Sequence, residues 1–161
     1  MKIRKATDED QKAVWVIFSA VIKTGDTYVF DPGTPKEDLK KLWFADSMKT
    51  FVAEEDGIIL GTYFIKPNQI GLGDHIANCG YMVNPTAQGK GIGKRLCEHS
   101  LQTAKEEGYK GMQFNIVVST NTGAVKLWEK FGFTIIGTTP KGFRHLKLGF
   151  VDTYMMFKSL E

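Results

Sequence analysis

The stretch NPTAQGKGIGKRL, residues 84–96, carries three glycines and three basic residues where the apolar spacing predicts the start of a helix. A helix N-terminus has unpaired N–H groups and a partial positive charge, so carboxylates stabilise it and cations destabilise it. Lys90, Lys94 and Arg95 go against this preference. A glycine inside a helix costs a further ~1 kcal/mol relative to alanine. The pattern indicates that a bound anion supplies the missing negative charge.

Two common phosphate-binding motifs do not fit this loop. The GxxxxGK[ST] loop needs four residues between its glycines and a hydroxyl after its lysine, whereas Gly89 and Gly93 enclose three and Arg95 follows Lys94. The dinucleotide fingerprint GxGxxG would need a third glycine at Lys94. What remains is a loop of small residues whose backbone N–H groups can bind a phosphate. A glycine-rich turn beside a solvated basic helix face is the alternative.

Composition limits the class of protein. The 161 residues are 42% hydrophobic and 12% aromatic, which predicts one domain, residues 1–161, with a core that needs no metal or disulfide. The net charge of +3 is spread along the chain, which argues against a nucleic-acid partner. Cys79 and Cys97 lack metal-ligand spacing and are expected to be free thiols. No apolar stretch approaches the ~18 residues of a membrane span, so we expect a cytoplasmic protein without a membrane partner.

Hydrophobic periodicity and turn residues predict a mixed α/β chain. One helix is expected between Thr7, a cap followed by three acidic residues, and Gly25. The pair Asp56-Gly57 predicts a hairpin turn within an antiparallel meander. The remaining helices are expected at residues 35–46, 89–107 and 121–131, and the strands at 2–6, 50–55, 58–65, 75–83, 111–118, 133–138 and 149–158.

Two stretches of the chain match sequence motifs of one enzyme family. Gln88-x-x-Gly91-x-Gly93 resembles the Q/R-x-x-G-x-G/A signature of the GNAT superfamily of acetyl-CoA-dependent N-acetyltransferases. The family block N-x-x-A-x-x-L-Y-x-x-x-G-F is matched at Asn121, Ala124, Leu127, Trp128, Phe131, Gly132 and Phe133. The element order from Met1 to Lys158 also resembles the family. This implies a GNAT-like mixed sheet, mostly antiparallel in its N-terminal half, with splayed central strands and helices on both faces.

The resemblance implies acetyl-CoA as the cosubstrate and assigns residues to it. Its pyrophosphate would be bound by the main-chain N–H groups of Gln88, Gly89, Lys90, Gly91, Ile92, Gly93 and Lys94. The backbone of Met82 and Val83, in a strand usually splayed by a bulge, would hold the pantetheine arm, and one of these N–H groups would polarise the thioester carbonyl. Asn121 would bond the pantetheine amide region, and an ordinary helix cap is its equally good alternative role.

The acid that protonates the departing thiolate is in doubt, because Trp128 stands where the family often has tyrosine. A closer resemblance concerns residues 75–83 and 112–128, which are similar to fungal enzymes that acetylate proline analogues such as azetidine-2-carboxylate. Strand asparagines serve the substrate in those enzymes, and Asn78 and Asn115 match their positions. We therefore expect both to act in catalysis. An internal amide pair that satisfies buried backbone groups is the alternative.

Three further residues are candidates for binding the acceptor. Tyr28 and Asp31 fall in the long loop 24–35, where family members commonly shape the acceptor pocket. His75 opens the strand 75–83, and an ordinary histidine pKa near 6.5 would suit a base. A turn role for Asp31 before Pro32 and a surface role for His75 remain open.

These observations together predict an acyltransferase. The expected reaction is direct transfer of an acetyl group from acetyl-CoA to the amine of a small molecule, an amino acid or an analogue, in a ternary complex without a metal or a cysteine nucleophile. A protein Nα- or lysine-acetyltransferase and a non-catalytic acyl-CoA sensor are the alternatives. Homodimers are frequent among proteins of this kind, so a homodimer is one candidate assembly.

Overall fold

Seven strands form one mixed sheet in the order β1-β2-β3-β4-β5-β7-β6 in a computed structural model that describes residues 1–161. Only the β4–β5 pair is parallel, and all other neighbours are antiparallel. The predicted mixed sheet with an antiparallel N-terminal half is therefore confirmed. The strands are β1 (Lys2–Lys5), β2 (Lys49–Glu55), β3 (Ile58–Pro67), β4 (Ile76–Val83), β5 (Gly111–Val118), β6 (Thr134–His145) and β7 (Gly149–Ser159).

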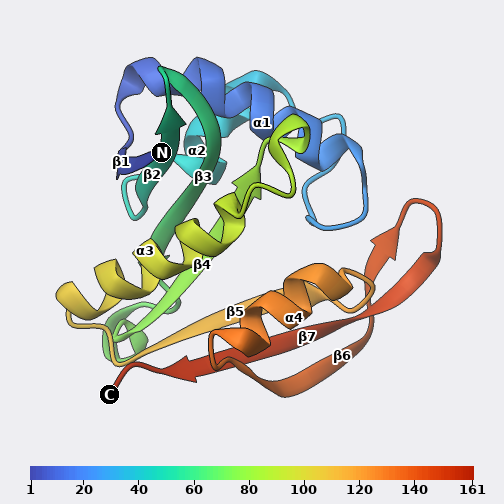
Figure 1. The fold of residues 1–161 in the computed structure, drawn as a ribbon. Coiled ribbons are helices and arrows are strands. Elements are labelled where there is room, and N and C mark those ends of the chain that lie inside the picture. Colours follow the sequence, from blue (N-terminus) through green and yellow to red (C-terminus); the bar gives the residue numbers. More distant parts are fainter.

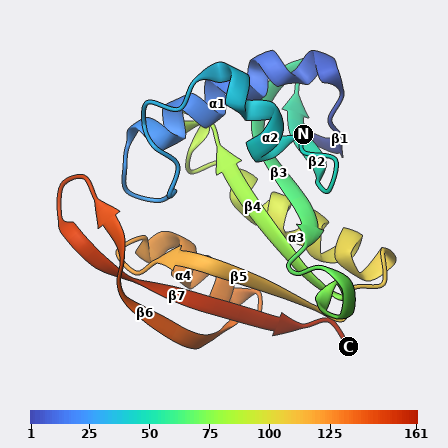
Figure 2. The same cartoon turned by 180° about the vertical axis from the view of Figure 1, so that it is seen from behind.

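Helices cover both faces of the sheet (Figures 1 and 2). On one face lie α1 (Gln11–Lys23) and α2 (Leu39–Trp43), and on the other lie α3 (Ile92–Glu106) and α4 (Thr122–Lys130). Each face has its own hydrophobic cluster, one under α1 and α2 around Phe18 and Trp43, and one under α3 and α4 around Leu96 and Met112. Short 3-10 turns span Asp8–Asp10, Lys36–Asp38, Gly71–Gly73 and Pro85–Ala87.

The sheet opens into a V between β4 and β5 (Figure 1). These two strands are paired only at Ile76 with Gly111 and at Ala77 with Met112, and then separate. The pairing of β5 with β7 shifts register between Phe114 and Val117, on the stretch of β5 that is no longer paired with β4. The resemblance implied a bulge in the strand that ends at Val83, but β4 pairs with β3 without a register shift. The irregularity beside the splay is therefore in β5 and not in β4.

Three predicted elements differ from the structure. Helix α3 begins at Ile92 rather than at residue 89, because Gly89 and Gly91 have φ angles of +80° and +72° that no right-handed helix contains. Lys90 therefore lies outside the first turn, while Lys94 and Arg95 lie in it. The helix expected at 35–46 is a 3-10 turn followed by five residues of α2. Strand β6 runs to His145, past the expected end at 138, through a register shift between Thr139 and Phe143.

The cap predicted at Thr7 is a capping box with Asp10, and Asp10 also forms a charged pair that stabilises the fold. The Asp10 carboxylate accepts hydrogen bonds from Arg4 Nη1 and Nη2 at 2.8 and 2.9 Å and from the Thr7 N–H at 2.7 Å. The hydrogen bond from Arg4 is the main reason that the pKa of Asp10 lies below its usual value. We expect Asp10→Asn to lower the free energy of unfolding at pH 7 by about 2 kcal/mol.

The effect of Asp10 on stability depends on pH in a defined direction. Its folded pKa is depressed, so its contribution is present above the unfolded-state pKa of about 3.9 and is lost as the pH falls through the folded pKa. Urea unfolding of the wild type and Asp10→Asn at neutral and at progressively acidic pH measures this. A difference that stays constant into acid would contradict the assignment.

Candidate functional site

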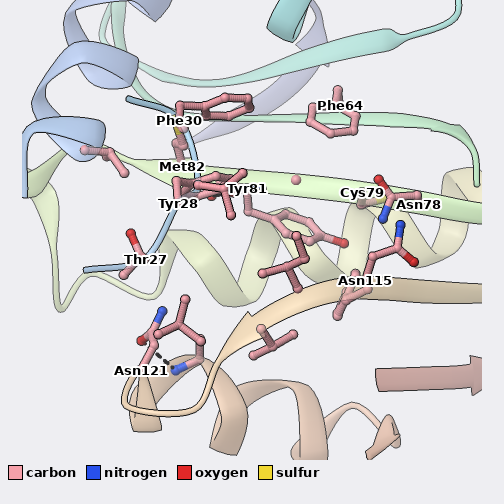
Figure 3. Close-up of a pocket in the computed structure, with 18 of the residues that line it drawn as sticks. Thr27, Tyr28, Phe30, Phe64, Asn78, Cys79, Tyr81, Met82, Asn115 and Asn121 are labelled. Atoms are coloured by element: carbon pink, nitrogen blue, oxygen red, sulfur yellow. Dashed lines mark hydrogen bonds between the residues drawn. The ribbon is translucent and has the colours of Figure 1, made fainter. Parts of the chain in front are cut away.

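A cavity of about 540 Å³ lies where β4 and β5 separate (Figure 3). Its walls come from the loop residues 27–30, the end of β3, most of β4, the second half of β5 and the start of α4. The cavity reaches Gln88 and Asn121 on the side of α3 and α4, and Phe64 and Asn78 on the side of α1 and α2. It therefore connects the glycine-rich loop region with a second compartment on the opposite face of the sheet.

The backbone of β4 presents alternate residues to the opening. The Ile76 carbonyl accepts a hydrogen bond from the backbone N–H of Asn68, and the Asn84 N–H donates to the Leu60 carbonyl. The even-numbered residues of β4 therefore direct their backbone N–H and C=O groups towards β3. The odd-numbered residues Tyr81 and Val83 therefore direct theirs into the splay. This corrects the role predicted for Met82, whose N–H faces β3 and whose side chain is buried against the α1 side. Of the two predicted N–H donors, only Val83 faces the cavity.

Tyr28 ties the long loop to this edge of β4. Its hydroxyl accepts from the Tyr81 N–H at 2.8 Å and donates to the Tyr81 carbonyl. Burial raises the pKa of the Tyr28 phenol, so the hydroxyl keeps its proton and makes both bonds. The ring stacks on Phe30 at a centroid distance of 5.9 Å (Figure 3). The predicted acceptor residue Tyr28 thus forms a wall of the cavity.

Removing the Tyr28 hydroxyl tests this connection. We expect Tyr28→Phe to lower the free energy of unfolding by about 1–2 kcal/mol, because two backbone groups of Tyr81 lose their partner. If the acceptor expected from the sequence binds beside this loop, its KM should rise more than the KM of the cosubstrate. Thermal unfolding and steady-state kinetics measure the two effects. The second is wrong if both KM values change equally.

Hydrogen bonds of asparagine side chains connect β5 with β4 and with the loop that follows β3. Asn78 Nδ2 donates to the carbonyl of Gln113 at 2.9 Å, and Asn115 Nδ2 donates to Asn68 Oδ1 at 2.7 Å. The side chains of Asn78 and Asn115 lie on facing strands at the cavity (Figure 3). Gln113 Nε2 donates to Asn115 Oδ1 at 3.1 Å. No side-chain hydrogen bond uses Asn78 Oδ1, so this acceptor is available to a ligand.

The start of α3 offers backbone donors to an anion. Gly91 is the N-cap, no side chain caps the helix, and the first turn holds no carboxylate. The N–H groups of Ile92, Gly93 and Lys94 precede the first α-helical hydrogen bond, from Arg95 to Gly91. A side chain at Gly89 or Gly91 would meet no atom within 4 Å, so the space beyond them is open. These features fit a pyrophosphate.

The chain matches a known protein family over most of its length. Residues 18–133 match the family model described as the acetyltransferase (GNAT) family. The chain belongs to the GNAT family. Members use acetyl-CoA, which supplies an acetyl group activated as a thioester. The open backbone donors at the start of α3 fit that cosubstrate.

Similar proteins place the chain within the GNAT family. A GCN5-related N-acetyltransferase from Kribbella flavida is 39% identical and superposes with a TM-score of 0.94 over 98% of this chain and 96% of that one. The N-acetyltransferase aca1 of Schizosaccharomyces pombe is 41% identical over 108 residues, which are 64% of this chain and 51% of the relative. The chain thus spans about half the length of that curated relative. The yncA protein of Salmonella typhimurium, solved with its cofactor acetyl-CoA, shares the fold at 22% identity and a TM-score of 0.84, covering 100% of this chain and 94% of that one.

Two residues that were predicted to bind the acceptor lie away from the cavity between β4 and β5. Asp31 is exposed, and its Oδ1 accepts from the Gly33 N–H at 2.7 Å, which is the turn role left open by the sequence. His75 lies in a separate pocket with Lys49 and Glu107. The structure therefore brings Tyr28, Asn78 and Asn115 together and leaves Asp31 and His75 outside the group.

Asn121 and Trp128 border the cavity from α4. Asn121 Oδ1 accepts from the Ala124 N–H at 3.4 Å, so it caps the helix, and the residue also lines the cavity. Trp128 is buried between Tyr81 and Phe114, at centroid distances of 5.0 and 4.9 Å. Its ring shapes the wall where the family often has a phenol.

Neither cysteine is placed to act as a nucleophile. Cys79 and Cys97 are free and buried, and burial raises the pKa of both thiols. A thiol held neutral in this way is a poor nucleophile. No group of three or more His, Cys, Asp or Glu side chains is arranged to hold a metal ion. None of the helices combines the length and hydropathy needed to cross a bilayer.

Sequence reasoning missed Phe64 and Lys66, which line the cavity at the end of β3. The expected strand stopped at residue 65, although its alternation already placed position 66 on the same face as position 64. The signal was the pairing register, which sets Phe64 opposite Gly80 and Lys66 opposite Asn78. The register becomes known only when both strands are placed.

Proposed function

We propose that this chain transfers the acetyl group of acetyl-CoA directly to the amine of a small molecule, with amino acids and their analogues as acceptors. The observation that carries the proposal is the single cavity that joins the α3 side of the sheet to a compartment walled by Tyr28, Phe64 and Asn78. A volume of about 540 Å³ suits a small-molecule site. Because part of it must hold the pantetheine arm, the acceptor that fits is small.

The residues of the chain suggest a role for each part of the cavity. The N–H groups of residues 88–94 would hold the pyrophosphate, with Lys94 adding charge. The Val83 N–H would donate to the carbonyl oxygen as negative charge develops there, which is the kind of stabilisation that contributes most to acyl transfer. Asn121 would bond the pantetheine amide region. Asn78 Oδ1 would accept from the amine and orient it.

The proposed reaction needs no side chain in the cavity that accepts the proton of the amine. Its lining holds no Asp, Glu or His, so the acceptor reacts as the neutral amine or gives its proton to water. The C–N bond forms at the acetyl carbon, the C–S bond breaks, and coenzyme A leaves with the proton as a free thiol. Trp128 cannot donate that proton, and a CoA thiolate is already a tolerable leaving group.

An acceptor screen tests the proposal. The protein is incubated with acetyl-CoA and with amino acids, proline analogues including azetidine-2-carboxylate, polyamines, or peptides, and free thiol is measured. We expect release with small amines, the proline analogues being tested first because of the resemblance carried by Asn78 and Asn115. Release with peptides alone would favour a protein acetyltransferase. Tight CoA binding without thiol release would favour an acyl-CoA sensor.

We also propose a cellular location and an oligomeric state for the protein. Free thiols at Cys79 and Cys97 favour the cytoplasm, where thiols are kept reduced. A homodimer stays a prediction, which light scattering at several protein concentrations tests.

A further inference from the structure

We infer that Lys66 selects acceptors that carry a carboxylate next to the amine, and that its ammonium pairs with that carboxylate. The inference rests on the proposed function and narrows its substrate class. Lys66 is the only charged side chain among the residues that line the cavity, and no Asp or Glu lines it. The acceptor compartment therefore has a fixed positive charge and no negative one.

The position of Lys66 places this charge beside Asn78. The two residues are directly opposite in the antiparallel β3–β4 pair, so their side chains share one face of the sheet with Cβ atoms roughly 5 Å apart. An α-amino acid holds its amine and its carboxylate on the same carbon. An acceptor whose amine binds Asn78 Oδ1 therefore presents its carboxylate within reach of the flexible lysine chain.

The ammonium of Lys66 lacks a protein partner of opposite charge. It lies 5.9 Å from the centre of the Phe64 ring, and no ion pair of the structure includes it. Lys66 is also half-buried in a mainly apolar wall. A partly desolvated ammonium gains more from a carboxylate than from a ring face. A carboxylate on the ligand supplies the missing partner.

The same charge disfavours competing acceptors. Polyamines, and peptides rich in lysine, would bring further cations into a compartment that has no carboxylate to receive them. A positive neighbour also favours the neutral form of an amine, because like charges disfavour protonation. Lys66 would thus bind the carboxylate and assist the amine in losing its proton.

Matched acceptors and matched variants test the inference. The acceptors are an amino acid, its carboxamide and the corresponding amine without the carboxyl group, for example proline, prolinamide and pyrrolidine. For the wild type we expect kcat/KM to be about 10- to 50-fold higher for the acid than for the amide. Lys66→Met keeps the chain length and should remove this preference, lowering kcat/KM for the acid and leaving the amide within about 2-fold. Lys66→Arg should retain most of the preference.

Lys158→Met is the matched control, because Lys158 is also a half-buried strand lysine but does not line the cavity. It should keep the wild-type preference, and the KM for acetyl-CoA should stay the same in all variants. Equal use of acid and amide by the wild type, or equal loss of both in Lys66→Met, would overturn the inference.

A binding measurement separates this inference from the proposed function. Calorimetry with the same acceptors in the presence of coenzyme A should show the acid bound about 10-fold more tightly than the amide, and the difference should vanish in Lys66→Met. If no amine releases thiol, the proposed function fails, while calorimetry still reports whether Lys66 recognises a carboxylate. If thiol is released and the calorimetric difference is absent, only the inference fails.

Discussion

Replacing Gly91 with glutamate is expected to lower the affinity for acetyl-CoA by about 100-fold or more. Gly91 is the N-cap of α3, and beyond it lies open space in which the pyrophosphate is proposed to bind. A carboxylate there would repel the diphosphate and compete for the same backbone N–H groups, which are strong donors to an anion. A factor of 100 corresponds to about 2.7 kcal/mol.

The backbone at Gly91 also disfavours a side chain, so strain must be separated from charge. Its φ of +72° costs a non-glycine residue about 1–2 kcal/mol. Gly57→Glu is the matched control, because Gly57 has a φ of +76°, also faces open space, and lies in the β2–β3 turn away from the cavity. Calorimetric titration with acetyl-CoA should show wild-type affinity for Gly57→Glu. Unchanged affinity in Gly91→Glu would remove the proposed pyrophosphate site.

Local sequence rules predicted the elements whose signals are local. The Asp56-Gly57 turn connects β2 and β3 as expected, with positive φ angles at both residues, and β5 occupies residues 111–118 as predicted. The predicted element boundaries were wrong where a residue type, such as glycine, occurs in more than one backbone conformation. Gly89 and Gly91 read as weak helix formers but adopt left-handed loop conformations. The strand expected to end at residue 138 continues to His145 through a register shift between Thr139 and Phe143.

The site was predictable where a motif fixes it and unpredictable where strand pairing fixes it. Gln88, Asn121, Asn78 and Asn115 were all proposed from the sequence, and all line the cavity. Whether Met82 or Val83 directs its N–H into the splay depends on whether the even- or the odd-numbered residues of β4 form hydrogen bonds with β3. The sequence alone does not determine this. The placement of Lys66 opposite Asn78 depends on the same register.

Replacing Asn78 with alanine is expected to lower kcat by about 100-fold, with the affinity for acetyl-CoA within about 2-fold of the wild type. The free Oδ1 atom of Asn78 would no longer orient the amine, and misplacement of a reacting group costs about this factor. The variant also leaves the Gln113 carbonyl without its donor, so the free energy of unfolding should fall by about 1 kcal/mol. Single-turnover kinetics and calorimetry separate the effects on turnover and on affinity.

The structural alternative for Asn78 predicts a different pattern. In that alternative, the Asn78 amide serves only to bond Gln113 where β4 and β5 separate. Asn78→Ala should then lose stability and change the separation of the two strands, which would weaken acetyl-CoA binding. Turnover at saturation should stay near that of the wild type. Asn68→Ala is the control, because Asn68 bonds Asn115 at the outer end of the same hydrogen-bond network but does not line the cavity. A loss of turnover in Asn78→Ala that Asn68→Ala does not share would separate positioning of the acceptor from support of the strands, since both variants remove one amide from the same network.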